Sequence, residues 1–297
     1  MKIFDCFMYF NEDLILDIRL HELYNKIDKF VIVESKHTHS GITKGYNFDI
    51  NKFKKFSDKI EYIQIDENPK NLFLIDAADD EITKCHKEIQ NALLIENFQR
   101  NCLDRGLNSA ENEDIILISD LDEIPNLENV NFKKNINKII LFKQYFFQYR
   151  FDLFLDNFFF FGSKACSKKN FLSPQWLRNI KNKKYEFYRL DTYFSKKKYT
   201  NIHIVEKGGW HFTNIMSPEK LEYKLRSYLH HGEIPRNITE RTFLEKMIKE
   251  REINYDHAAD KRSERYTKKK LSFFNKELLP KYIKDNLIKF DNWFYKN

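Results

Sequence analysis

The sequence predicts an α/β protein in which a mixed, mostly parallel sheet is flanked by helices. Two observations carry this prediction. Short apolar runs alternate with stretches of helical periodicity through the N-terminal half, and parallel strands that are buried on both faces have such continuous apolar runs. The chain of 297 residues has only 7 Gly and 6 Pro. We therefore expect no flexible linker, and a single domain over residues 1–297.

The strand–helix alternation is clearest before residue 126. Strands are expected at residues 2–10, 29–35, 60–66 and 114–120. A helix follows the first strand, because Leu16, Leu20 and Leu23 recur at helical spacing. A second, long helix is expected over 80–106, where Gly106 is suited to end it. In sheets built from such βαβ units, ligands bind at the carboxyl ends of the strands.

The pattern changes beyond residue 126. The run "KIILFKQYFFQYRFDLF" (138–154) predicts long strands of the same mixed sheet, and an irregular region follows to about Gly209. Helices are expected at 218–229, 240–252 and 277–290. The C-terminal part therefore reads as a helical appendage to the sheet.

The stretch "IILISDLDEIP" (115–125) crowds three acids at the end of an expected buried strand. Asp120, Asp122 and Glu123 repel one another unless a cation or a shared proton relieves the repulsion. One interpretation is a divalent-metal site, because an Asp-x-Asp turn directs two carboxylates at one point. The others are the nucleophile of an Asp-based phosphatase, and an acidic turn without function.

Several function classes lack their usual marks. Phosphatases of the Asp type usually carry the motif on their first strand, with Thr or Val where Ile124 stands. The motifs GxGxxG, GxxxxGK[ST], GxSxG and HExxH are absent from the sequence. The four cysteines form no CxxC pair, which predicts free thiols and no structural zinc. No signal peptide or spanning segment is recognisable, so we expect a cytoplasmic protein.

Five stretches resemble glycosyltransferase family 17 in their order and spacing. They are "DCFMYFNEDLILDIRLHEL", "DKFVIVESKHTHSG", "ENFQRN", "IILISDLDEIP" and "GGWHFTNIMSPEKLEYKL". That family includes the β-1,4-mannosyl-glycoprotein N-acetylglucosaminyltransferase, which adds bisecting GlcNAc to N-glycans. The resemblance runs from Lys2 into the C-terminal helices and implies a GT-A-like, Rossmann-type fold, a UDP-sugar donor and inversion at the anomeric carbon. Phe212 and Thr213 stand where Cys and Ser are expected in the animal enzymes, which leaves the acceptor and the donor sugar open.

The resemblance implies a division of labour along the chain. Residues 1–125 would bind the nucleotide sugar, 126–255 the acceptor, and 256–297 would form a basic helical tail. The expected reaction is metal-dependent, inverting transfer of N-acetylglucosamine from UDP-GlcNAc, in β linkage, to a glycan. The alternatives are an Asp-based phosphohydrolase and a non-catalytic binding module with a basic tail.

The same resemblance favours the metal interpretation of the acidic cluster. Asp122 is the leading ligand of Mn²⁺ (or Mg²⁺) and is in that sense catalytic. Asp120 would reach the ribose, or the metal through water, and Glu123 would orient the loop. His211 would complete the metal shell, since imidazole suits Mn²⁺, or it is a packed core residue. Trp210 would stack on a sugar, or it too belongs to the core.

Three further residues are candidates for donor binding. Glu34 closes the second strand, where the nucleoside would lie, but it could equally be a solvated acid. Arg100, on the helix before the acidic strand, could pair with the diphosphate or with the acidic cluster itself. Lys44, in the loop after the second strand, is a weaker candidate for phosphate.

Inverting transfer also needs a base to take the proton of the acceptor hydroxyl. Glu233, in "HHGEIPR", is preferred because a turn there could face the site. Asp256 and Glu206 compete with it, and the sequence does not separate the three.

The formal charge of +7 is concentrated at the C-terminal end. Residues 260–297 carry 11 Lys or Arg against 5 Asp or Glu. Such a tail can attract nucleic acid, anionic lipid or acidic glycan, or it is a solvated helix face. For a transferase we expect no nucleic acid. We expect peripheral contact with the inner face of an anionic membrane, where a lipid-linked or lipopolysaccharide acceptor would lie.

Overall fold

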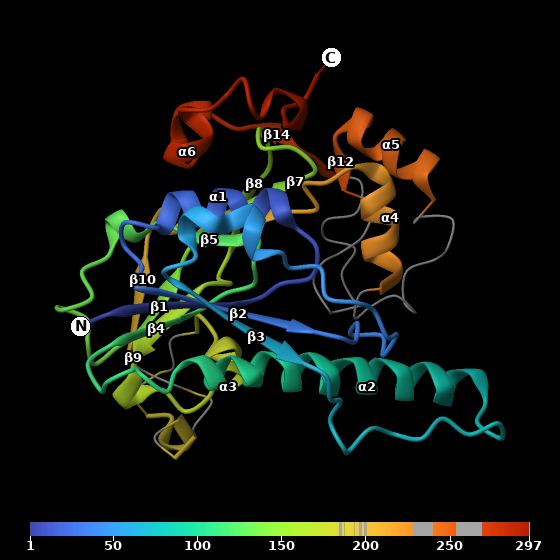
Figure 1. The fold of residues 1–297 in the computed structure, drawn as a ribbon, viewed down its shortest axis with the longest axis horizontal. Helices are drawn as coiled ribbons and strands as arrows, with labels where there is room; N and C mark the ends of the chain where they lie inside the picture. Colours follow the sequence, from blue (N-terminus) through green and yellow to red (C-terminus); the bar gives the residue numbers. More distant parts are fainter. Residues whose placement is uncertain are drawn as a thin grey trace.

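Helices cover both faces of a central sheet (Figure 1). The computed structural model describes residues 1–183, 186, 188–192, 194, 195, 198, 201–227, 240–253 and 269–296. Helix α1 (Asp13–Leu23) lies on one face of the sheet, and α2 (Glu81–Asn101) and α3 (Pro174–Asn179) lie on the other. The expected α/β fold with a mostly parallel, Rossmann-like sheet is confirmed.

The central sheet has seven strands in the order β10–β6–β9–β4–β1–β2–β3. They are β1 (Ile3–Met8), β2 (Lys29–Ser35), β3 (Ile60–Ile65), β4 (Ile115–Ile118), β6 (Ile139–Phe142), β9 (Lys164–Ser167) and β10 (Ile202–Val205). β1 pairs in parallel with β2 and β4, and β9 is antiparallel between β4 and β6. β9 and β10 lie in the region expected to be irregular, so that expectation was wrong.

Successive side chains of the central strands enter two different cores. Phe30 and Ile32 pack on the side of α1, whereas Val31 and Val33 pack on the opposite side. Both faces of β2 are therefore apolar, as its continuous apolar run predicts.

A second sheet has five strands in the order β14–β8–β7–β11–β5. They are β5 (Glu123–Pro125), β7 (Gln144–Gln148), β8 (Leu153–Phe160), β11 (Gly209–Thr213) and β14 (Ser272–Phe273). The run 138–154 is thus divided between two sheets, contrary to the expectation of one, and the chain changes sheet at Lys143 between β6 and β7. β11 pairs with β5 so that His211 lies opposite Glu123, which brings the "GGWHFT" stretch beside the acidic turn.

The C-terminal part is built from short elements. α4 (Pro218–Ser227) and α5 (Arg241–Glu250) match the expected helices, and β12 (Glu252–Ile253) pairs with β13 (Lys269–Lys270). The continuous helix expected over 277–290 is wrong, because Pro280 lacks an N–H and its ring blocks a continuing helix. Instead, a 3₁₀ turn (Lys276–Leu278) precedes the short helix α6 (Lys281–Lys284). α6 packs against α1, where the Tyr282 and His21 rings stack at 3.9 Å.

The four cysteines are unpaired, as expected. Burial raises the pKa of the Cys6 and Cys166 thiols, so both are packing residues. Within the part of the chain that the structure describes, no helix combines the length and apolar character needed to cross a bilayer.

Candidate functional site

The acidic turn lies at the carboxyl end of β4, near the middle of the central sheet. Because β4, β1 and β2 are parallel neighbours, their carboxyl ends meet at this edge. The edge faces α4 in Figure 1. This is the place at which ligands bind in sheets of this class.

Arg19 binds the turn from the side of α1. The side chain, on α1, is fully buried, and its guanidinium donates to both carboxylate oxygens of Asp5 on β1, at 2.8 and 2.5 Å. Its Nη1 also donates to the backbone carbonyls of Asp120 (3.3 Å), Leu121 (3.2 Å) and Glu123 (2.7 Å). One arginine therefore holds three carbonyls of the turn.

Arg178, at the end of α3, holds the turn from the other side. It donates to both oxygens of Glu123, each at 2.7 Å, to Asp120 Oδ2 at 2.6 Å, and to the carbonyl of Gly162 at 2.5 Å. A Cβ on Gly162 would lie 2.1 Å from the Glu123 carboxyl group. Only glycine leaves room for this buried pair. Glu123 orients the turn, as proposed from the sequence, and it does so through Arg178.

Arg100 completes the set of cations around Asp120. Its Nη2 donates to Asp120 Oδ1 at 3.2 Å and to Glu96 at 2.6 Å, and its Nη1 donates to Gln175. Burial alone would raise the pKa of Asp120, but the guanidinium groups of Arg178 and Arg100 hold it well below its ordinary value. Of the two partners proposed for Arg100, the structure shows the acidic cluster. The guanidinium groups of Arg100 and Arg178 therefore supply positive charge that relieves the repulsion between Asp120 and Glu123.

Asp122 points to a different environment. Its Oδ1 lies 3.4 Å from Nε2 of His211, and its Oδ2 lies 3.9 Å from Nζ of Lys224 on α4. Burial would raise the pKa of Asp122, but the charges of His211 and Lys224 lower it. The two aspartates of the motif therefore have separate partners, arginines for Asp120 and a His–Lys pair for Asp122.

His211 is buried on β11 between aromatic rings. The ring of Phe160 lies 4.5 Å away and that of Phe146 lies 5.2 Å away, edge-on. Nε2 lies 2.8 Å from the Thr213 hydroxyl, whereas Nδ1 has no hydrogen-bond partner among the described residues. Gly209, with φ of +126°, allows β11 to approach β5 this closely, because a Cβ there would lie 2.2 Å from the carbonyl oxygen of Ile124.

Helix α4 and the loop after β1 border the site on the side of Asp122, and we call this border its mouth. Lys224 also lies 3.3 Å from the carboxylate of Glu12, so it bridges that loop and the turn. The rings of Phe10 and Tyr223 stack with centroids 6.1 Å apart, and Nζ of Lys44 lies 5.3 Å from the Phe10 ring. The mouth therefore combines two stacked aromatic rings with two lysines.

Glu34 holds the loop after β2. Its buried carboxylate accepts from Lys44 Nζ (2.6 Å), from the Tyr62 hydroxyl (2.8 Å) and from the backbone N–H groups of Asn47 (2.8 Å) and Phe48 (3.0 Å). These bonds fix the loop at the carboxyl end of β2. Glu34 is thus not a solvated acid, and Lys44 is tied to it.

Of the remaining candidates, Trp210 lies beside the turn, opposite Ile124, but its side chain is buried in the core. Its Nε1 donates to the carbonyl of Leu278. Glu206 lies on the surface and forms an ion pair with Lys143 at 2.8 Å. Glu233 and Asp256 lie outside the described residues, as do residues 256–268 of the basic tail.

The sequence analysis missed Arg19, Arg178, Lys224 and Glu12. A signal existed for Arg19, because it lies between the apolar helix positions Leu16 and Leu23, while Asp5 interrupts an apolar strand. Opposite charges on two buried faces indicate a buried pair. No local pattern marks Arg178 or Lys224, which reach the site only through the fold.

A divalent cation fits Asp122 and His211 but not Asp120. Ligands about 2.1 Å from one octahedral ion lie about 3 Å apart, and the Asp122 and His211 atoms are 3.4 Å apart. Both carboxylate oxygens of Asp120 are bound by arginines. Among the described residues, no group of three or more His, Cys, Asp or Glu side chains could hold a metal ion. Only two of the three expected ligands are therefore brought together.

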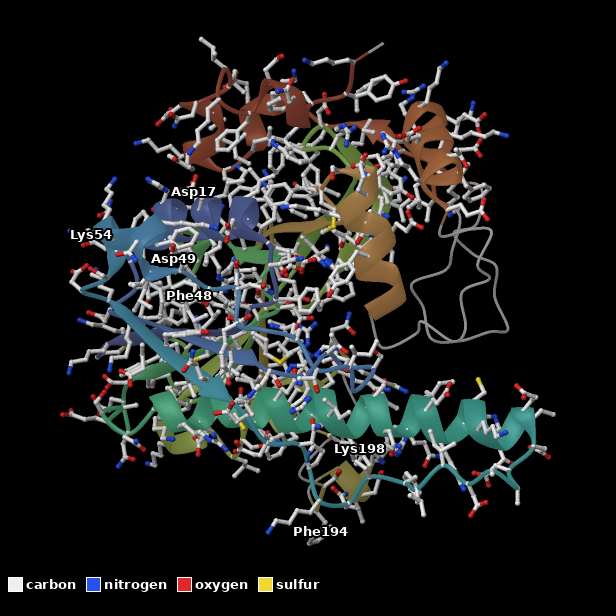
Figure 2. All side chains as sticks on the ribbon, turned by 45° about the vertical axis from the view of Figure 1, so that its right-hand side comes forward. Asp17, Phe48, Asp49, Lys54, Phe194 and Lys198 are labelled. Atoms are coloured by element: carbon white, nitrogen blue, oxygen red, sulfur yellow. The ribbon has the colours of Figure 1, made fainter. Side chains whose placement is uncertain are left out.

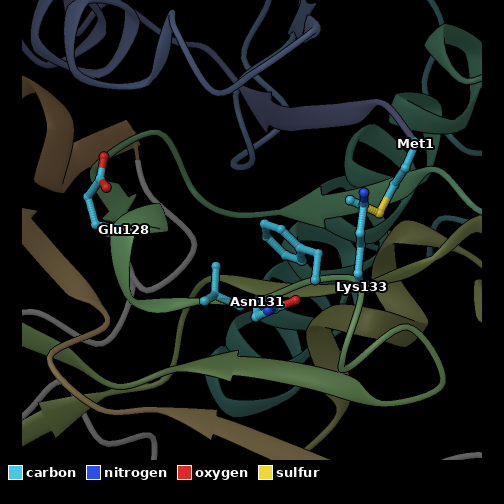
Figure 3. Close-up of a pocket in the computed structure, with 6 residues that line it drawn as sticks. Met1, Glu128, Asn131 and Lys133 are labelled. Atoms are coloured by element: carbon cyan, nitrogen blue, oxygen red, sulfur yellow. The ribbon is translucent and has the colours of Figure 1, made fainter.

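A shallow depression lies at the opposite end of the sheet (Figure 3). It is lined by Met1, Glu128, Val130, Asn131, Phe132 and Lys133. β1 begins beside it, so it is separated from the turn by the length of the strand. Its titratable groups are Glu128, Lys133 and the N-terminal amine of Met1, whereas the turn gathers several buried charged groups, so we assign the site to the turn.

Lys164, at the start of β9, is a further buried cation close to the arginines. Its Nζ donates to the carbonyl oxygens of Arg178 and Ile180. Burial, together with the charge of Arg178, lowers the pKa of Lys164 to about 7. The lysine anchors the chain just beyond α3.

We expect Lys164 to make stability rise between pH 7 and 8. The unfolded side chain has a pKa of about 10.4. Above pH 7 the unfolded state therefore binds more protons than the folded state, and the free energy of unfolding should increase by at most about 1.4 kcal/mol per pH unit. Above about pH 8.5 the buried thiols act in the opposite direction, because their pKa values are raised.

Urea unfolding of the wild type and of Lys164→Met at these two pH values measures the effect. The difference in slope between the two proteins isolates Lys164 from the other titrating groups. An equal slope in both proteins would contradict the assignment.

Comparison with known proteins identifies the family. The profile of glycosyltransferase family 17 matches residues 1–292. No curated protein matches the sequence. Among solved structures, the 2-C-methyl-D-erythritol 4-phosphate cytidylyltransferase of Francisella tularensis is similar over 75% of this chain and 98% of its own, with 12% identity and a TM-score of 0.31. The match over nearly the whole length establishes that the chain belongs to glycosyltransferase family 17.

Proposed function

We propose that the protein transfers N-acetylglucosamine from UDP-GlcNAc to a glycan hydroxyl, with inversion. Family membership supports sugar transfer. The structural observation that supports this location of the active site is the position of Asp122. Its carboxylate faces His211 and Lys224 at the carboxyl end of the central strands. Asp122 is the one acid of the motif that no arginine binds among the described contacts.

The donor would lie across the mouth of the site. The stacked rings of Phe10 and Tyr223 offer a flat surface to a nucleobase or a sugar. Lys224 is the cation that we assign to the diphosphate, since its long side chain can shift from Glu12 and Asp122 toward phosphate oxygens. Arg100 and Arg178 act as positioning residues, because they hold Asp120 and the turn.

Asp122 and His211 are the residues that we assign to Mn²⁺ (or Mg²⁺). A cation bound there would neutralise the charge that develops on UDP as it leaves. Asp120 would contribute through Arg178, by keeping the turn in place. The donor's phosphate oxygens and water would supply the remaining ligands.

The base that receives the acceptor's proton is a carboxylate in this proposal. Glu233 is the candidate from the sequence. Glu12 joins it, because its side chain is nearly buried at the mouth and lies beside Lys224. Replacing the residue that acts as base by Gln should strongly lower kcat while the affinity for UDP is kept. Replacing the other carboxylate by Gln should change kcat much less.

The test of the donor site is a thermal-shift titration. We expect UDP with Mn²⁺ to raise the melting temperature, UDP with EDTA to have little effect, and His211→Ala to lose the shift. His203→Ala, on the edge strand β10, is the matched control and should keep it. Equal stabilisation by UDP with EDTA would refute the metal assignment, and a full shift in His211→Ala would refute the role of His211.

The phosphohydrolase alternative is less well supported. An aspartate nucleophile needs a carboxylate oxygen free to attack phosphorus, whereas both oxygens of Asp120 are bound by guanidinium groups. Release of phosphate from simple esters in the presence of Mg²⁺ would revive that alternative. As acceptor we propose a lipid-linked glycan or a lipopolysaccharide.

A further inference from the structure

Two half-buried aromatic rings on β8 extend from the site along the second sheet. Phe158 and Phe160 alternate with the exposed Phe159, so they project from one face of the strand and Phe159 projects from the other. The Phe160 ring lies 4.5 Å from the His211 ring. The buried ring of Phe146 on β7 contacts both, with centroids 6.3 Å from Phe160 and 5.2 Å from Phe158. We call Phe158 and Phe160 the aromatic wall, which begins at His211.

The end of β8 is bonded to the acidic turn. Just beyond the aromatic wall, the carbonyl of Gly162 accepts from Arg178 at 2.5 Å. The hydroxyl of the next residue, Ser163, donates to the carbonyl of Glu123 at 3.0 Å. Arg178 also binds the Glu123 carboxylate. These bonds hold the aromatic wall at a fixed position relative to the turn that carries Asp122.

Asp122 connects a cationic side of the site with the aromatic wall. Its Oδ2 lies 3.9 Å from Nζ of Lys224, and its Oδ1 lies 3.4 Å from Nε2 of His211, which contacts the Phe160 ring. Helix α4, which carries Lys224, packs beside the strands of the second sheet (Figure 2). A succession of contacts therefore runs from the lysine, through the aspartate and the histidine, to the aromatic wall.

Inverting transfer uses opposite sides of the donor sugar. The acceptor oxygen bonds to the anomeric carbon from the face opposite the diphosphate, while the bond from that carbon to UDP breaks and the hydroxyl proton passes to the carboxylate base. With the diphosphate at Lys224, the acceptor is expected at the other end of the succession of contacts. The aromatic wall lies at that end.

We propose that Phe158 and Phe160 bind the acceptor through a pyranose ring, whose C–H face stacks on the aromatic wall. The face of a phenyl ring carries negative charge, which attracts the positively polarised C–H groups of a sugar. In a β-D-glucopyranoside the C–H groups at C1, C3 and C5 all project from one face of the ring. The reacting sugar of the acceptor is therefore a neutral pyranose of this kind. This assignment rests on the proposed function, but it does not depend on the donor sugar.

Saturation-transfer NMR with methyl β-D-glucopyranoside tests the aromatic wall. In the presence of UDP and Mg²⁺, saturation of the protein's aromatic protons should reach the glycoside protons at C1, C3 and C5. D-Glucitol, a polyol without a ring, should receive far less. Phe158→Leu and Phe160→Leu should each weaken glycoside binding by about 3- to 10-fold, whereas Phe160→Tyr keeps the ring and should bind as the wild type does.

Phe159→Leu is the matched control. Phe159 lies between the two wall residues but projects from the opposite face, where its ring contacts Lys143 and Tyr145. Its replacement should leave glycoside binding unchanged. All of these variants should keep the thermal shift with UDP and Mn²⁺, because the aromatic wall is not assigned to the donor.

Three results would overturn the proposal. The first is that the wild type transfers no saturation to the glycoside, or transfers as much to D-glucitol. The second is an equal loss of glycoside binding in Phe159→Leu. The third is loss of both the UDP shift and glycoside binding in Phe160→Leu while Phe158→Leu keeps both, which would make Phe160 only a packing partner of His211.

The same measurements without UDP separate this proposal from the proposed function. A wild type that binds the glycoside through the aromatic wall but shows no shift with UDP and Mn²⁺ would refute the donor site and support the aromatic wall. A wild type that shows the UDP shift but does not bind the glycoside would refute the aromatic wall alone.

Discussion

Asp122→Asn is expected to reduce sugar transfer by about 100- to 1000-fold and to abolish the Mn²⁺-dependent shift with UDP. The substitution keeps the size of the side chain but removes the charge that faces His211 and Lys224. The variant should remain folded, because Asp122 does not contribute its side chain to the arginine contacts that hold the turn. Steady-state assays and thermal shifts measure the two effects.

The stability of this variant distinguishes two explanations of the cluster. If the acids repelled one another, Asn at 122 would stabilise the free protein. The structure indicates the opposite sign, because neighbouring positive charge lowers the pKa of Asp122 and favours its charged form. We expect a small loss of stability near neutral pH, and Asp285→Asn on the surface as control should show none. Full activity in Asp122→Asn would remove Asp122 from the mechanism.

Arg19→Met is expected to cost about 3–5 kcal/mol of unfolding free energy. The variant leaves the buried carboxylate of Asp5 without its cation, and it removes one donor from each of the carbonyls of Asp120, Leu121 and Glu123. The Asp120 carbonyl keeps the N–H of Glu123, and the Glu123 carbonyl keeps the Ser163 hydroxyl. Urea unfolding measures the loss. Because the turn also loses the hydrogen bonds from Arg19, the activity of the protein that remains folded should fall as well.

Two companion variants separate charge from geometry. Arg19→Lys keeps the charge but cannot reach Asp5 and the three carbonyls together, so it should be intermediate. Arg19→Met with Asp5→Leu removes the unpaired charge and should recover part of the loss. A single Arg19→Met variant within about 1 kcal/mol of the wild type would show that this buried pair is not what holds the turn.

Sequence patterns predicted those parts of the fold whose signal is local. β2 and β4 were recognised as continuous apolar runs and β1 and β3 as short runs rich in apolar residues, and α2 was expected as a long helix ending near Gly106. β9 was missed for a physical reason. "KACS" has only four residues and no distinctive period, and it becomes a strand by pairing with β4 and β6 on either side.

For the site, too, residues with a local sequence signal were predicted and contacts formed only by the fold were not. Asp120 and Asp122 were found because the motif is contiguous, and His211 because family resemblance marked its stretch. Their different partners were not predictable, since Arg178 and Lys224 lie far along the chain from the turn. The contiguous motif therefore directed attention to both aspartates, and the tertiary structure gives them different partners, with arginines beside Asp120 and His211 and Lys224 beside Asp122.

The insertion of β9 between β4 and β6 has a consequence for synthesis on the ribosome. β4 gains its second neighbour only when residues 164–167 have emerged, and β6 gains β10 only when residues 202–205 have emerged. Until then the nascent chain carries an unpaired apolar edge in the centre of its future sheet, an arrangement that promotes aggregation. We therefore expect the nascent chain to be most prone to aggregation between the synthesis of residues 118 and 167, when β4 lacks a partner on that side, and less so until residue 205, when only the outer edge of β6 is unpaired.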